Sequence, residues 1–195
     1  MHPATHLLLS WTVADFARLQ PRDRNLVTWC GVVPDLDGLG VILDLGNELL
    51  RRPETMFYPE YHHFLTHGLP AALIVPALFC LCGRERWRVF LWGLLVFHLH
   101  LLCDFAGSRG PSPTDLWPVY YLAPLSRYPM LVWAGQWRLD GWQNFTVTLG
   151  VLALVFGRAV TRGYSPVSLF SSAADQTVVR VFRKWCGFER TLPGD

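Results

Sequence analysis

The segment YHHFLTHGLPAALIVPALFCLC (Tyr61–Cys82) places three histidines at the start of a run that is otherwise almost entirely apolar. From Tyr61 to Gly83 the chain has no Asp, Glu, Lys or Arg. A helix needs roughly 17–25 apolar residues to cross a bilayer, so this run is long enough for one span. The histidines at its mouth need a separate explanation, because ionisable groups at membrane depth are costly.

Two further runs lack acidic and basic residues, Val89–Cys103 and Gly141–Gly157. The chain as a whole is 51% hydrophobic, and its mean hydropathy is +0.24. We therefore predict an all-α fold, a polytopic membrane helical bundle with about three spanning helices, the first over Phe64–Cys82. The alternative is a soluble helical protein with unusually buried helices.

Two short helices are expected before the first span. The first runs from a cap at Thr5 to Leu19, and the second covers about Asn25 to Val33 and ends at Pro34. The segment 38–61 mixes polar and apolar residues, so we expect a loop with one or two helical turns.

The bundle is expected to form a membrane-embedded domain over residues 1–162, followed by a polar tail over residues 163–195. Within the tail, Ser171–Trp185 is typical of a cationic amphipathic helix on a membrane surface. The first residues lack a basic leading segment, so we expect no cleavable signal peptide.

The arginines predict the topology. If consecutive helices alternate in direction, twelve basic residues lie at one end of the bundle and five at the other. The positive-inside tendency makes the end with twelve cytoplasmic. No basic stripe on a soluble face is apparent, so the pattern does not favour a nucleic-acid partner.

The same alternation brings the histidines and several aspartates to the opposite end. His6 opens the first helix, Asp35 and Asp37 close the second, and residues 62–67 open the first span. His100 and Asp104 close the second span, four residues apart on one helix face, and His63 and His67 share that spacing. His98 is on another face, and we expect it to be structural.

Imidazole and carboxylate ligands together suit zinc, and also manganese or iron. Convergence of segments that are far apart in the sequence therefore predicts a metal site. His100 and His67 as axial ligands of a haem are an alternative, but the neighbouring carboxylates would then have no role.

Four motifs occur in an order that resembles the YdjM-like family of bacterial membrane-bound metal-dependent hydrolases: THLLLSW, VPDLDGL, YHHFLTHGL and FHLHLLCDFAGSRGPSPTDLWP. The resemblance covers about residues 5–120 and implies an integral protein of the bacterial inner membrane. The family is similar in its metal motifs to zinc-dependent phospholipase C. Carried over by position, the resemblance implies as metal ligands His6, Asp35, His62, His67, His100 and Asp104, and it also implicates Asp37.

Helical spacing and the family motif predict different ligands at one position. Helical spacing pairs His63 with His67, whereas the family motif places the ligand at His62 and makes His63 an outer or substrate-contacting group. The chain has no histidine after residue 100, so we expect one or two ions rather than three.

We therefore expect a metal-dependent hydrolase, with zinc as the favoured metal, that acts on a phosphoester or lipid-like substrate at the non-cytoplasmic face of the lipid bilayer. Asp37 is the candidate catalytic base. Arg51, Arg52 and Arg109 lie on the same side and are candidates for clamping a phosphate. The alternatives are a metal transporter or sensor that uses the same ligands, and a structural membrane protein without activity.

Overall fold

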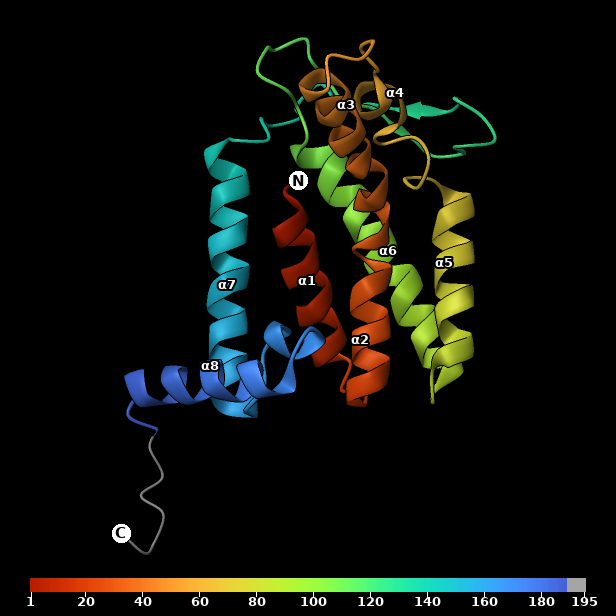
Figure 1. Ribbon diagram of the computed structural model, residues 1–195. Coiled ribbons are helices and arrows are strands. Elements are labelled where there is room, and N and C mark those ends of the chain that lie inside the picture. Colours follow the sequence, from red (N-terminus) through yellow and green to blue (C-terminus); the bar gives the residue numbers. More distant parts are fainter. Residues whose placement is uncertain (189–195) are drawn as a thin grey trace, which may run out of the picture. The chain divides into compact units, whose positions relative to one another are not determined.

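The computed structural model describes residues 1–188 of the chain, and for Pro59 only the backbone is described. Helices dominate, and a two-stranded antiparallel sheet of β1 (Val119–Tyr120) and β2 (Met130–Leu131) is small. The predicted all-α class is confirmed (Figure 1). Two compact units are formed, Met1–Phe145 and Thr146–Asp195.

The core of the first unit is a packed set of four helices: α1 (Pro3–Phe16), α2 (Pro21–Cys30), α5 (Leu69–Cys82) and α6 (Arg86–Gly107). Helix α6 contacts the other three, and α2 also contacts α1 and α5. The axes of α2 and α6 approach closely at Gly93, where a Cβ atom would lie 2.9 Å from Cys30 Sγ. Such small residues let membrane helices pack backbone to backbone.

The N-terminal helices begin earlier than predicted. His2, not Thr5, caps α1 by accepting a hydrogen bond from the Ala4 N–H (3.3 Å). Pro3 and Pro21 stand in the first turns of α1 and α2, where proline favours helix initiation because its missing N–H costs nothing.

The predicted loop over residues 38–61 is wrong. After Pro34 a 3₁₀ segment, η1 (Val33–Leu39), continues directly into α3 (Gly40–Leu49), and the short α4 (Phe57–Tyr61) follows. The apolar residues Val41, Leu45 and Leu49 recur every fourth position, a helical period that the intervening polar residues masked.

The first predicted span is shorter than expected. Residues 61–68 do not join α5, whose 14 residues begin at Leu69 with Pro70 in the first turn. Helices α6 and α7 (Trp142–Arg162) are long and apolar enough to cross a membrane, and α2 with the segment Val33–Leu49, bent by 49°, forms a third candidate. About three spans were predicted, and the segments that supply them differ in part.

The basic turns at the α1–α2 and α5–α6 connections lie together, as predicted from their arginines. Asp23 is fully buried at this end and accepts hydrogen bonds from the backbone N–H groups of Arg84 and Glu85, both at 2.9 Å. Arg88 donates to the carbonyl oxygen of Ala17 (2.7 Å). Six arginines therefore gather at one end of the first unit.

The second unit contains most of α7, the 3₁₀ segment η2 (Pro166–Leu169) and α8 (Ser172–Trp185). The helix predicted over Ser171–Trp185 is confirmed, with the Ser171 hydroxyl accepting from the Ala174 N–H (3.3 Å). Asp175 ties the turn before α8 by accepting from the Ser165 N–H (2.9 Å) and hydroxyl (2.6 Å).

Replacement of Gly68 tests the junction before α5. A Cβ at this position would lie 2.3 Å from the carbonyl oxygen of Ala123, which is backbone and cannot move aside. We expect Gly68→Ala to lose about 1–3 kcal/mol of stability, as overpacked sites do, and to lower Tm measured in detergent.

The matched control is Gly46→Ala in α3, where an added Cβ meets no atom within 4 Å. There the change should be neutral or slightly stabilising, since alanine favours helix over glycine. Equal melting temperatures for the two variants would contradict the close approach at Gly68.

Candidate metal centre

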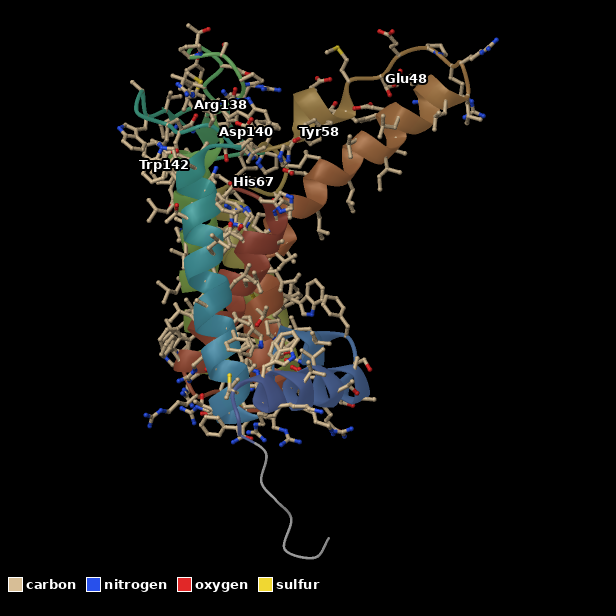
Figure 2. The ribbon with its side chains drawn as sticks, turned by 90° about the vertical axis from the view of Figure 1, so that its left-hand side faces the viewer. Glu48, Tyr58, His67, Arg138, Asp140 and Trp142 are labelled. Carbon is tan, nitrogen blue, oxygen red and sulfur yellow. The ribbon has the colours of Figure 1, made fainter. Side chains whose placement is uncertain are left out.

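The predicted ligands converge at the end of the first unit opposite the arginine turns. They come from α1, η1, the connection between α4 and α5, and α6, and Figure 2 shows His67 beside the lower end of α3. His6, His67, His100 and Asp104 are almost fully buried, each at most 2% exposed. Within residues 1–188, four groups of side chains are spaced to hold an ion: His6–His100–Asp104, Asp35–His67–His100, Asp37–His62–His67 and His63–His67–Asp104.

The centre of the cluster is formed by two imidazoles and two carboxylates. His67 Nε2 lies 3.3 Å from His100 Nε2 and 3.6 Å from Asp104 Oδ2. His100 Nε2 lies 3.0 Å from the same Asp104 oxygen and 3.8 Å from Asp35 Oδ1. The His67, His100 and Asp104 atoms therefore lie within 3.6 Å of one another, and Asp35 approaches from the side of His100.

The outer nitrogens of both rings are fixed by acceptors. His100 Nδ1 donates to the carbonyl oxygen of Gly31 (2.9 Å), and His67 Nδ1 pairs with Asp37 Oδ2 (3.0 Å). A hydrogen on Nδ1 leaves the Nε2 lone pair of each neutral ring directed into the cluster. Two lone pairs at 3.3 Å repel unless a cation or a proton lies between them.

These distances fit a tetrahedral ion. With Zn–N bonds of about 2.0–2.1 Å, two ligand nitrogens lie about 3.3–3.4 Å apart. The nitrogens of His67 and His100 have that separation. The second nitrogens are held by a carboxylate and a carbonyl, the usual outer partners of metal-bound histidines.

Buried atoms without hydrogen-bond partners add to the fit. His6 stacks on His100 (3.7 Å between ring centroids), and its Nε2 lies 3.1 Å from both Asp104 Oδ1 and the Met1 carbonyl oxygen. Both oxygens are acceptors, so Nε2 carries the hydrogen, and the buried Nδ1 has no partner. Asp35 Oδ2 is also buried and unpartnered, which suits a residue that awaits a cation.

Both carboxylate oxygens of Asp37 contact neighbouring residues. Its Oδ1 pairs with His62 Nδ1 (2.9 Å), while Oδ2 pairs with His67 and accepts from the Thr66 N–H (3.2 Å). In this geometry the carboxylate orients both imidazoles.

Both residues of the His62–His63 pair belong to the cluster. His62 contacts Asp37, whereas His63 groups with His67 and Asp104. His63 has a left-handed backbone (φ 65°), which turns the two consecutive side chains in different directions. The sequence left open whether His62 or His63 is the ligand. In the structure both side chains lie inside the cluster.

Two pockets adjoin the cluster and share Tyr58, His62, His63 and Trp117 in their walls. One, of about 370 Å³, also contains Glu60, Asp115 and Arg127. The other, of about 420 Å³, also contains Asp35 and several apolar side chains. Both volumes are in the range of small-molecule sites.

The predicted arginines do not line either pocket. Arg51 and Arg52 are exposed beyond the end of α3, and Arg109 lines a separate pocket with Trp137 and Asp140. Arg127, which sequence reasoning missed, is the arginine beside the histidines. It lies over the Phe64 ring (4.3 Å to the centroid), in a loop with no periodicity that could have revealed it.

His98 confirms its predicted structural role. Its Nδ1 contacts the Leu94 carbonyl oxygen (2.9 Å), and its Nε2 contacts the Tyr121 hydroxyl (3.1 Å). It stands outside all four candidate ligand groups.

Fold and cluster together define a helical membrane protein with a buried histidine–aspartate centre at one end. The chain belongs to the YdjM inner membrane protein family, whose sequence profile matches residues 1–170. This confirms the predicted family and the inner-membrane location. No curated protein and no solved structure matches the chain, and the similarity to zinc-dependent phospholipase C stays a prediction.

The pKa of His67 makes ion binding pH dependent. Burial lowers this pKa, but the contacts with Asp104 and Asp37 outweigh burial and raise it to about 9. Below that pH an ion must displace a proton from His67. We predict that the apparent zinc affinity falls about tenfold per pH unit from pH 9 down to about pH 6.5, measured by competition with a chromophoric chelator. An affinity that does not change over this range would contradict the role of His67.

Asp37→Asn tests the orienting contacts. An amide keeps the shape but cannot accept from both histidines with a full negative charge, so we expect zinc affinity to fall about 10–100-fold. Asp140→Asn is the matched control, since Asp140 is exposed and pairs with Arg138 (2.6 Å). Equal affinities in the two variants would show that Asp37 does not support the centre.

Proposed function

We propose that this protein is a membrane-bound metal-dependent hydrolase that acts on a phosphoester or lipid-like substrate at the non-cytoplasmic membrane face, with one or two divalent ions, zinc being favoured. The observation that carries the proposal is the pair of buried Nε2 atoms of His67 and His100 at 3.3 Å, each with its other nitrogen anchored. Two pockets open beside this pair. A metal ion would bind at the two Nε2 atoms, and the pockets would admit its substrate.

His67, His100, Asp104 and Asp35 would hold one ion, and His6 would contribute to a second with Asp104. A bound divalent ion would lower the pKa of a water molecule bound to it and would polarise a phosphoryl oxygen. The remaining work falls to the chain's own residues, which orient the ligands and move protons.

His63 is the better candidate for proton transfer than Asp37, whose two oxygens are already engaged. Burial lowers the pKa of His63 well below its usual value, which favours the neutral ring, the form that has one nitrogen lone pair available. It also lines both pockets. In hydrolysis the water oxygen would bond to phosphorus as the ester P–O bond breaks. The water proton would pass to the His63 ring and from there to the oxygen of the leaving alcohol.

The alternative of a transporter or sensor is less well supported. A transport path needs polar groups along the depth of the bundle. Here α5 and the segment Val89–Phe97 of α6 are apolar, although α1 and α2 bury Ser10, Thr12, Asp15 and Thr28.

The metal content of purified protein tests the proposal. We expect about one or two equivalents of zinc, manganese or iron in the wild type, and a loss of metal in His100→Ala and Asp104→Ala. His98→Ala is the matched control, because His98 is on the same helix and outside the candidate groups.

Wild-type protein should also hydrolyse para-nitrophenyl ethyl phosphate, with loss of that activity in the two ligand variants. Folded wild type that binds no metal after metal is added back would refute the centre. Bound metal without hydrolysis of any ester would favour the transporter or sensor.

A further inference from the structure

The pocket on the Asp35 side of the cluster has an apolar wall and a polar end. Its apolar lining comes from η1 and from the loop before α7, with Leu36, Leu39 and Leu139 among its residues. Its polar end is formed by Asp35, His62 and His63 of the candidate centre.

This pocket opens onto an apolar surface. Leu36 and Leu39 are 50% and 54% exposed, although they line the pocket. The surface continues along α3, where Ile42, Leu45 and Leu49 are 63%, 53% and 83% exposed. Figure 2 shows α3 leading away from the bundle toward Glu48.

An apolar surface of this length is costly in water and marks contact with a membrane or a partner. The segment α2–η1–α3 has the length and composition of a bent membrane span, and the chain is an inner membrane protein by family. The lipid phase therefore reaches the mouth of the pocket.

The second pocket lies across His62 and His63 and has a different character. It presents Glu60, Asp115 and Arg127 together with aromatic rings. One site with an apolar compartment on one side and a charged compartment on the other matches a molecule that has a chain and a polar head.

We propose that the Asp35-side pocket binds the alkyl chain of a membrane amphiphile, which enters laterally from the bilayer between η1 and the loop at Leu139. The bond to be cleaved then lies at Asp35 and His63, and the polar head occupies the Arg127 pocket. This inference rests on the proposed hydrolase and assigns its substrate class and direction of entry.

Two substrates that differ only in chain length distinguish the chain-binding pocket from the hydrolase activity itself. We compare para-nitrophenyl ethyl phosphate with para-nitrophenyl hexyl phosphate, using metal-loaded protein in one detergent. Full transfer of a methylene from water is worth about fourfold. Because the detergent competes for the chain, we expect kcat/KM to be about tenfold higher for the hexyl ester.

The variants are Leu39→Asn and Leu139→Asn, which place an amide in the pocket from two separate segments. Each should lower the hexyl-to-ethyl ratio at least about fivefold, because the chain then meets an unpaired polar group. Ile42→Asn is the matched control: it puts the same change on the exposed face of α3 outside the pocket, and it should keep the wild-type ratio. Metal content verifies that each variant is folded.

Each outcome decides one idea. A ratio near one in the wild type, or a high ratio that both pocket variants keep, would overturn the chain-binding pocket and leave the hydrolase intact. A loss of the ratio in Ile42→Asn as well would show a general surface effect and would also overturn it. Hydrolysis of neither ester by metal-loaded protein would overturn the hydrolase, and this inference with it.

Discussion

The Asp104 carboxylate is buried, and the rest of the first unit supplies the contacts that compensate for its burial. Removing a carboxylate from water costs several kcal/mol unless nearby groups compensate, and Asp104 is 1% exposed. Its Oδ1 contacts the Met1 nitrogen, Ser108 and His6, and its Oδ2 faces His100. These partners belong to α6, to α1 and to the segment just before α1, so the two helices must approach each other at this level. The network also fixes which ring atoms point inward.

The sequence allowed the helix-borne part of the centre to be predicted. His100 and Asp104 share a face because of their spacing, and helix alternation brought His6 to the same end. The partners in irregular backbone could not be found this way. Gly31 acts through a carbonyl oxygen that no side chain reveals. Arg127 lies in a loop without periodicity, whereas Arg51 and Arg52 lie beyond α3, in a segment whose mixed composition predicts a loop.

The conformation of the segment before α5 also could not be predicted from the sequence. Composition alone extended the span back to Phe64, but the Thr66 N–H donates to Asp37 and the Leu69 N–H donates to the Tyr121 carbonyl oxygen (2.7 Å). Those contacts remove residues 61–68 from the helix. A left-handed residue at His63 costs of order 1–3 kcal/mol, and such strain persists only where surrounding contacts determine the backbone. The cluster thus shapes its own loop, which no local propensity would predict.

The short α5 also limits where the centre can lie. Its 14 residues extend about 21 Å at 1.5 Å per residue, whereas the hydrocarbon core is about 30 Å thick. His67 stands two residues before this helix. If the far end of α5 reaches one boundary of the hydrocarbon core, the centre lies inside the core or at its other boundary. Water-soluble molecules would have to cross apolar surface to reach such a centre, whereas amphiphiles in the bilayer already lie at its depth. The exposed leucines of η1 and α3 and the leucines that line the pocket favour the same class of substrate.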